Sequence, residues 1–173
     1  QKFSPLSLST QKIQSITDLE EWPALTEYRG QHAGRIRVVS TLLDHSIQLR
    51  DHKKQRAQTL SKLMNLPDCR PLLIPNQTHT NRLIEAYRQD SDGTWFDRKN
   101  QITTQVEADG IWTTHSSIIL GVRSADCVPI LVFSTDEPFI AAIHSGWRGT
   151  KSRILDRVFE EAKKHGIDLP TLR

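Results

Sequence analysis

Two histidines and a cysteine carry the side chains best suited to metal or catalytic chemistry: His79, Cys127 and His144. Imidazole nitrogen and thiolate sulfur are ligands that zinc and copper accept. Three protein ligands with a fourth position left to water are typical of a catalytic zinc site, where the metal lowers the pKa of that water toward ~7. No zinc-finger spacing is present, so the residue types leave open a hydrogen-bonded strand-end histidine and a buried, unreactive cysteine.

The segment after His144 combines a flexible backbone with a cation. Gly146 and Gly149 allow backbone N–H groups to turn toward one point, and Arg148 can hold a phosphate or carboxylate with two hydrogen bonds. A helix starting directly afterwards would add partial positive charge. We therefore expect an anion or substrate site at Ser145, Gly146 and Arg148; the alternative is an ordinary loop with Arg148 on the surface.

The same residues also suit nucleophilic catalysis. Cys127 and His144 each stand at the end of an apolar run, so the imidazole could serve as the base for a thiol nucleophile. Asp126 adds a carboxylate that is costly to bury without a partner, and we expect it to orient a histidine or to transfer protons. The predicted catalytic group is therefore Cys127, His144 and Asp126, with metal-assisted and cysteine-hydrolase mechanisms both open.

Apolar runs and one amphipathic helix must position these residues. The helix is predicted from about residue 151 to residue 165, with Thr150 as its N-cap and Gly166 just beyond its C-terminus. Three apolar runs precede this helix, at residues 117–122, 128–133 and 139–143, and the lengths and flanking turn residues of these runs favour strands.

The first half of the chain predicts a strand at residues 35–43, a helix at 51–65 with Asp51 as its N-cap, and a short strand at 72–74. Asp92-Gly93 and Asp109-Gly110 are turn signals. Residues 1–34 are polar and poorly periodic, and we expect an N-terminal extension packed on the domain. Strands in the middle with helices on both sides predict an α+β fold of mixed β-sheets with flanking helices.

The composition is that of one soluble globular domain: 173 residues, 36% hydrophobic and 25% charged, with a net charge of +3. Basic residues are scattered along the chain with acidic ones among them, which argues against nucleic acid as a partner. No apolar run approaches the ~20 residues that cross a bilayer, and no secretory leader is evident. Two cysteines make no disulfide framework. We expect a cytoplasmic protein with a small-molecule substrate, and the oligomeric state stays open.

Four motifs resemble, in order and spacing, those of the YfiH/DUF152 family, also called the multicopper polyphenol oxidase or laccase-domain family. The motifs are Gln77-x-His79, Ala108-Asp109-Gly110, Ala125-Asp126-Cys127-x-Pro129 and His144-x-Gly146-Trp147-Arg148-Gly149-Thr150. The resemblance implies a single YfiH-like metal-binding catalytic domain over residues 35–173, with a fold of the cysteine-hydrolase type.

The resemblance also implies that His79, Cys127 and His144 bind Zn²⁺, with copper as the other candidate. It implies a purine nucleoside phosphorylase that acts on adenosine, inosine and methylthioadenosine and also deaminates adenosine, so that a purine nucleoside and phosphate are its substrates. Other members are described as copper-dependent polyphenol oxidases, and the fold has been grouped with cysteine hydrolases. The alternative for this chain is a Cys127–His144 hydrolase of an amide or ester. Only two of the seven histidines lie in the motifs, which argues against a multicopper oxidase.

Some of the family pattern is missing. Residues 40–50 lack the expected Thr-Arg-x-Gly-Gly-Val-Ser-like loop and the Asn-Leu-Gly segment, while Arg56 keeps the arginine of an Asn-Arg pair and is expected to contact substrate. The sequence stops at Arg173, before the Gly-Pro-Ser-Ile-like segment that the family pattern places next. We therefore expect part of the substrate pocket to be altered or absent, and a catalytically degenerate metal-binding protein remains an alternative.

Overall fold

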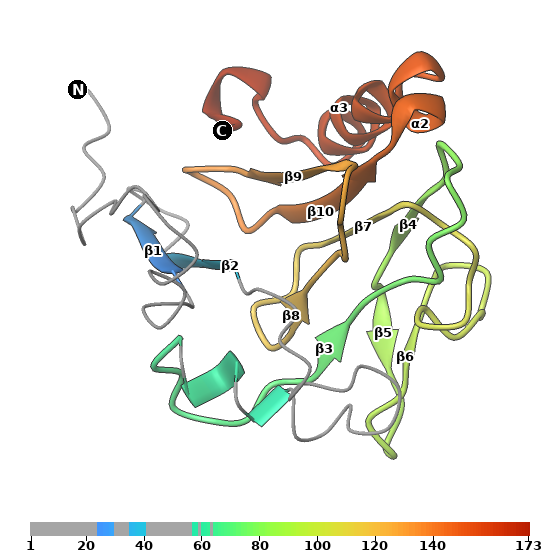
Figure 1. Cartoon of the computed structure of the whole chain (residues 1–173). Helices are drawn as coiled ribbons and strands as arrows, with labels where there is room; N and C mark the ends of the chain where they lie inside the picture. The colour runs from blue at the N-terminus through green and yellow to red at the C-terminus, as the bar shows by residue number, and fades with distance from the viewer. Residues whose placement is uncertain (1–23, 30–34, 41–56, 59, 63) are drawn as a thin grey trace, which may run out of the picture. The chain divides into compact units, whose positions relative to one another are not determined.

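The computed structural model describes residues 24–29, 35–40, 57–58, 60–62 and 64–173. Contacts divide the chain into a smaller unit, Gln1–Gly30 with Gly34–Pro71, and a larger unit, Gln31–Ala33 with Leu72–Arg173. Figure 1 shows the described elements and draws the remaining residues as a grey trace.

An antiparallel pair of strands belongs to the smaller unit. Strand β1 (Ala24–Arg29) pairs with β2 (Arg35–Ser40) in a register that places Ala24 opposite Ser40. The expected strand at 35–43 is confirmed over residues 35–40, whereas β1 was not predicted. Residues 57–58 and 60–62 are helical, as expected. Asp51 and Arg56 lie outside the described residues.

A four-stranded mixed sheet forms the centre of the larger unit, in the order β4-β7-β10-β9. Its strands are β4 (Leu83–Glu85), β7 (Gly110–Thr113), β9 (Val128–Phe133) and β10 (Ile140–Ser145). β4 runs parallel to β7, and the other neighbours are antiparallel. The strands predicted at 128–133 and 139–143 are therefore confirmed, with the second shifted toward His144. Because β10 is a central strand, the backbone of His144 is held on a well-supported element.

Shorter strand pairs flank this sheet. β3 (Leu72–Leu73) pairs in parallel with β8 (Ile119–Leu120), so the run at 117–122 is a strand only at its centre. β5 (Arg88–Gln89) and β6 (Trp95–Phe96) form a hairpin. Gly93 has φ +87° in the hairpin turn, a conformation that favours glycine, and this confirms the turn predicted at Asp92-Gly93.

The turn predicted at Asp109-Gly110 is wrong. Gly110 is the first residue of β7, and a Cβ atom there would lie 2.6 Å from Cδ1 of Leu83 on the neighbouring strand. The glycine therefore allows two strands to approach closely instead of turning the chain. Asp109 is fully buried, which no turn signal could indicate.

The helix predicted at 151–165 is two helices, α2 (Trp147–Lys151) and α3 (Ile154–Lys164). Arg153 separates them in a left-handed conformation, with φ 57°. Thr150 is consequently not an N-cap but a residue inside α2. Gly166 has φ +73° just beyond α3, as predicted. A short 3-10 helix, η2 (Leu169–Thr171), follows.

Helix α3 packs its apolar face against the central sheet (Figure 1). The buried cluster between them combines large side chains from the sheet with small and branched ones from the helix: Trp112, Phe139, Ile143, Ile154, Val158 and Ala162. The predicted α+β class with mixed sheets and flanking helices is therefore confirmed. Among the helices of the described residues, none is long and apolar enough to cross a bilayer.

Candidate metal centre

Three separate segments of the larger unit bring His79, Cys127 and His144 together. His144 lies near the end of β10, Cys127 directly precedes β9, and His79 lies in the loop between β3 and β4. The register of β9 and β10 pairs Val128 with Ser145, which places Cys127 beside the end of β10. One nitrogen from each imidazole and the Sγ atom of Cys127 lie within 4.8 Å of one another. The three predicted ligands therefore form one cluster.

The carboxylate of Asp109 fixes the loop that carries His79. His79 has φ +61°, an unusual angle for a residue other than glycine, and this conformation turns successive N–H groups toward one point. The backbone N–H groups of Thr78, His79 and Thr80 donate to the Asp109 carboxylate at 3.3, 3.0 and 2.6 Å. The Thr80 hydroxyl donates to it as well, at 2.9 Å. The carboxylate thus occupies a backbone nest and holds the strained loop in place.

Asp109 also binds the imidazole of His144. Its Oδ1 atom lies 2.7 Å from Nδ1 of His144, and both side chains are buried. Burial raises the pKa of Asp109, but the hydrogen bonds from His144, Thr80 and His79 outweigh it, so the pKa lies below its ordinary value. An ionised carboxylate only accepts hydrogen bonds, so Nδ1 of His144 carries the proton and Nε2 is left as the nitrogen that can bind a metal.

Gly146 lies directly against the cluster. A Cβ atom at this position would be 3.0 Å from Cδ2 of His79 and 3.1 Å from Sγ of Cys127. Gly149 makes a similar close approach, since its Cβ would lie 3.1 Å from the carbonyl oxygen of Thr80. Neither glycine has a positive φ. Their observed contribution is therefore space for the clustered side chains, and the anion-binding role expected from the sequence stays a prediction.

Gln77 joins the His79 loop to the segment that leads to Cys127. Its side-chain amide donates to the carbonyl oxygen of Arg123 at 2.7 Å and accepts from the N–H of Arg123 at 2.8 Å. Gln77 belongs to the first of the four motifs, which gave no indication of this role. The one sequence signal for this link is the position of Gln77 in the motif Gln77-x-His79.

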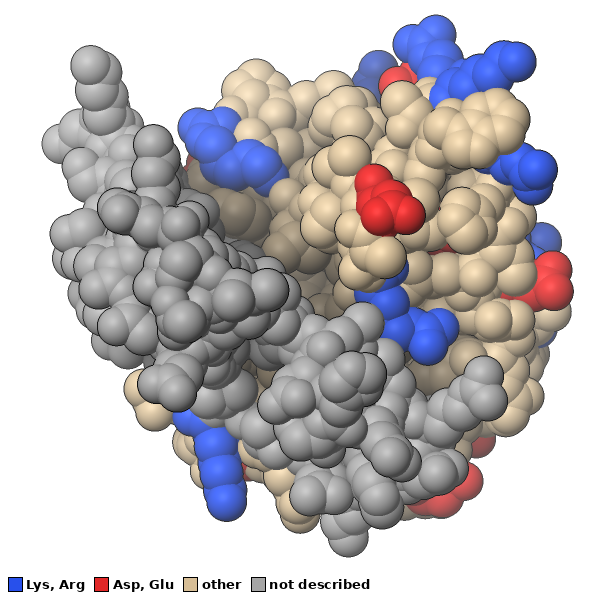
Figure 2. Space-filling model, in the orientation of Figure 1, with Lys and Arg blue, Asp and Glu red and all other residues tan. Residues whose placement is uncertain are grey.

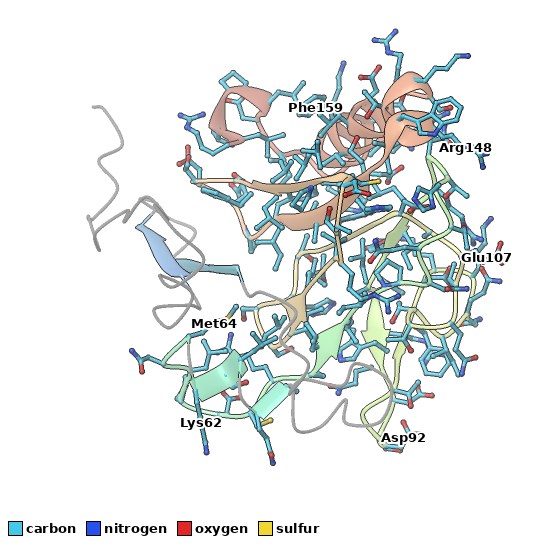
Figure 3. The ribbon with its side chains drawn as sticks, viewed as in Figure 1. Lys62, Met64, Asp92, Glu107, Arg148 and Phe159 are labelled. Atoms are coloured by element: carbon cyan, nitrogen blue, oxygen red, sulfur yellow. The ribbon has the colours of Figure 1, made fainter. Side chains whose placement is uncertain are left out.

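The expected anion-binding residues fall into two groups. Ser145 is buried, and its Oγ atom lies 2.8 Å from Oγ1 of Thr150, which donates to the carbonyl oxygen of Gly146 at 3.0 Å. These hydroxyls connect the end of β10 to the first turn of α2. Arg148 is exposed and points away from α2 (Figure 3). It belongs to a group of exposed cations where α2 and α3 lie (Figure 2), comprising Arg148, Lys151, Arg153 and Arg157.

Asp126 is exposed, and no hydrogen bond of its carboxylate is observed to the described residues. The orienting role expected of it belongs to Asp109 in this structure. Asp109 stood in one of the motifs, but sequence reasoning took it for a turn residue because its burial could not be seen. Asp126 keeps a solvent-accessible carboxylate next to Cys127, which suits proton transfer better than orientation.

The donor set fits a borderline-soft ion. Two imidazoles and one thiolate, one imidazole being backed by a carboxylate, are typical of zinc and copper sites. His79 is exposed, Cys127 is half-buried and His144 is buried. An ion bound to these atoms would therefore be reachable from solvent on the His79 side, as a catalytic metal must be.

Comparisons with known proteins bear on this site. The family model described as multi-copper polyphenol oxidoreductase laccase matches residues 31–171. Purine nucleoside phosphorylase RP494 of Rickettsia prowazekii is 30% identical over 119 residues, which cover 67% of this chain and 45% of that protein. Adenosine deaminase RL5, from an unknown prokaryotic organism, is 29% identical over 174 residues, covering 96% of this chain and 62% of that protein. The chain thus spans about half the length of these relatives.

A solved structure extends the likeness to the fold. The hypothetical protein YfiH of Bacillus licheniformis superimposes with a TM-score of 0.56 at 22% identity, and the match covers 89% of this chain and 58% of that one. The YfiH-like fold expected from the motifs is therefore confirmed.

Proposed function

This chain belongs to the multi-copper polyphenol oxidoreductase laccase family, as its motifs indicated, and we propose that it is a metal-dependent enzyme acting on purine nucleosides. The observation that carries the proposal is the cluster of His79, Cys127 and His144, with Asp109 holding both histidines. The proposed reactions are phosphorolysis of adenosine, inosine and methylthioadenosine, and deamination of adenosine. The names of two relatives, a purine nucleoside phosphorylase and an adenosine deaminase, support these reactions.

The metal we propose is zinc, with copper as the alternative that the family name raises. Such an ion supplies Lewis acidity and a nucleophilic water near neutral pH. A multicopper oxidase needs several metal centres. Within the part of the chain that the structure describes, only this one group of three or more His, Cys, Asp or Glu side chains is close enough to hold an ion. Polyphenol oxidation is therefore the less favoured activity.

We propose a separate role for each of the protein's own groups. Asp109 keeps the proton on Nδ1 of His144 and fixes the His79 loop. Asp126, which is exposed beside Cys127, is proposed as the group that gives or takes a proton at the substrate. Arg148 is proposed to bind phosphate, with Ser145 and Gly146 setting the start of the helix that carries it. Arg56, from the family pattern, remains a proposed substrate contact.

We further propose that residues 35–173 act as one catalytic domain, preceded by an N-terminal extension. The family match over residues 31–171 crosses both compact units and supports this assignment. Both cysteines are free thiols, in keeping with a reducing, cytoplasmic environment.

The test uses the full chain loaded with zinc, incubated with adenosine and phosphate and analysed by chromatography. Adenine reports phosphorolysis, inosine reports deamination, and hypoxanthine reports both in sequence. Cys127→Ala should abolish product, whereas Cys69→Ala, at the exposed second cysteine, should not. The absence of all three products from zinc-loaded protein would overturn the proposal.

A second candidate is a cysteine hydrolase of an amide or ester. Asp109, His144 and Cys127 supply an orienting carboxylate, an imidazole and a thiol in one cluster, which is the order of groups in a nucleophilic triad. This candidate requires a reactive thiolate in metal-free protein. Iodoacetamide should then alkylate Cys127 much faster than exposed Cys69, and equal or slower labelling of Cys127 would eliminate it.

A further inference from the structure

Trp147 is the most exposed of the large hydrophobic side chains in the described part of the chain, with 70% of its surface accessible. Trp95 and Trp112 are only 4% and 2% exposed. Exposing an indole forfeits the burial that usually stabilises tryptophan, so this side chain has no packing role that explains it. A binding role is the physical alternative.

The position of Trp147 connects it to the metal cluster. It is the first residue of α2 and directly follows Gly146, whose backbone lies against His79 and Cys127. Side chains on a helix lean toward its N-terminus, which here is the end at Gly146. The indole therefore extends from the rim of the cluster.

The backbone beneath Trp147 is rigidly held. Thr150 bonds back to Gly146 through both its N–H group, at 2.9 Å, and its hydroxyl, at 3.0 Å. Gly149 packs against the backbone of Thr80 in the His79 loop. The first turn of α2 thus moves with the ligand residues, and an aromatic ring placed on it keeps a defined position relative to them.

One cation beside Trp147 and one exposed apolar residue opposite Ser145 indicate what the indole can receive. The guanidinium of Arg148 lies 5.3 Å from the centre of the Trp147 ring, within range of a cation–π interaction. Val128, next to Cys127, is 58% exposed and paired in register with Ser145. One exposed apolar side chain thus follows Cys127 and another follows Gly146, and a positive charge lies beside the indole. A flat aromatic group that carries a polar or anionic part fits this combination.

We infer that Trp147 is the stacking platform for the planar base of the substrate, with Arg148 steadying the indole and contributing positive charge beside it. The inference rests on the proposed function and identifies a base-binding residue for the same site. Bases stack on indole through their π faces, so the platform accepts adenine and hypoxanthine alike and leaves discrimination between them to other groups.

The test measures binding of adenosine to the full, zinc-loaded chain by calorimetry, for the wild type, Trp147→Ala and Trp147→Phe. Removing a stacking residue should weaken adenosine binding about tenfold or more, while phenylalanine should keep most of the affinity. Phe159→Ala is the matched control, because Phe159 is an exposed aromatic residue on the neighbouring helix α3 (Figure 3) and should leave binding unchanged. Zinc content and the affinity for ribose 1-phosphate, which lacks the base, should be the same in all variants.

Equal adenosine affinity in the wild type and Trp147→Ala would overturn the inference. If Trp147 instead lies on a self-association surface, the adenosine affinity would be equal in the two proteins and Trp147→Ala would have a lower molecular mass in sedimentation. The outcomes separate this inference from the proposed function. Trp147-dependent binding without turnover would refute the reactions and retain the platform. Turnover with the same KM in Trp147→Ala would retain the reactions and refute the platform.

Discussion

Nδ1 of His144 lies 2.7 Å from Oδ1 of Asp109, and the same carboxylate accepts the backbone N–H of His79 at 3.0 Å. One buried anion thus positions two imidazoles that come from a strand and from a loop. It sets the tautomer of the first imidazole and the backbone conformation of the second. This relationship makes Asp109 the residue on which the geometry of the cluster most depends.

Asp109→Asn should therefore weaken metal binding strongly. An asparagine offers one acceptor oxygen where the aspartate offers two, and its NH₂ group meets donors that need an acceptor. Loss of such a supporting group costs about 10–100-fold in metal affinity, and the unsatisfied N–H groups should destabilise the fold by about 2 kcal/mol. Competition with a chromophoric chelator measures the first effect, and urea unfolding the second.

Asp97→Asn is the matched control for that variant. Asp97 is also buried, but it accepts N–H groups from Lys99 and Gln101 and none from a ligand residue. Both N–H groups donate to Oδ1, which asparagine keeps as a carbonyl oxygen, so Asp97→Asn should lose less stability than Asp109→Asn and should keep its metal affinity. If Asp109→Asn kept its metal affinity as well, Asp109 would be a purely structural residue.

The lowered pKa of Asp109 predicts how stability depends on pH in metal-free protein. Because this pKa lies below its ordinary value of 3.8, the folded state favours the ionised form. The resulting stabilisation is complete above the unfolded pKa and is lost as the pH falls through the folded pKa. The free energy of unfolding should decline below about pH 4, and the decline should be shallower in Asp109→Asn. Parallel curves of unfolding free energy against pH for the wild type and Asp109→Asn would contradict the assignment of this pH dependence to Asp109.

Gly146→Ala should impair metal binding more than it impairs folding. The added Cβ would lie 3.0 Å from Cδ2 of His79 and 3.1 Å from Sγ of Cys127. These two side chains cannot move away from the added atom while both bind one ion. Overpacking of this kind costs about 1–3 kcal/mol, which corresponds to about tenfold or more in affinity. Gly166→Ala should show the opposite result, since its φ of +73° makes alanine strained but nothing lies within 4 Å of the added atom. Chelator competition and thermal unfolding distinguish the two.

Gln77→Ala should lower metal affinity by a smaller factor. The substitution removes both hydrogen bonds between the His79 loop and Arg123, so the two segments are less firmly held together. A loss of about 1 kcal/mol per bond corresponds to a fewfold to about thirtyfold weaker binding. Gln89→Ala removes a glutamine whose side-chain amide donates to the carbonyl oxygen of Gly93, in a different hairpin, and this variant should bind zinc normally. Equal affinities of the two variants would show that the link does not support the cluster.

Local residue types predicted the main strands and the three side chains that the structure brings into one cluster. Imidazole and thiol chemistry pointed to His79, Cys127 and His144, which the structure brings together and whose metal binding stays a prediction. The apolar runs around residues 130 and 141 located β9 and β10. These predictions succeeded because they depend on the chemistry or hydrophobicity of consecutive residues. β1 was missed because its pairing with β2 compensates for a polar sequence.

Features that depend on burial or tertiary contact could not be predicted. Asp126 stood next to a ligand in sequence, but Asp109 reaches two ligands in space. The helix after His144 breaks at Arg153, although the sequence reads as continuous, and the carbonyl oxygen of Ser152 accepts from Asn81 in the His79 loop at 3.1 Å. Contacts of this kind leave no local pattern in the sequence.

The most direct test of the account is metal analysis of the purified full chain beside His79→Ala, Cys127→Ala and His144→Ala, with Cys69→Ala as the control and circular dichroism to check folding. We expect one zinc ion per chain in the wild type and in Cys69→Ala, and little or none in His79→Ala, Cys127→Ala and His144→Ala. Unchanged zinc content in any one folded ligand variant would contradict it.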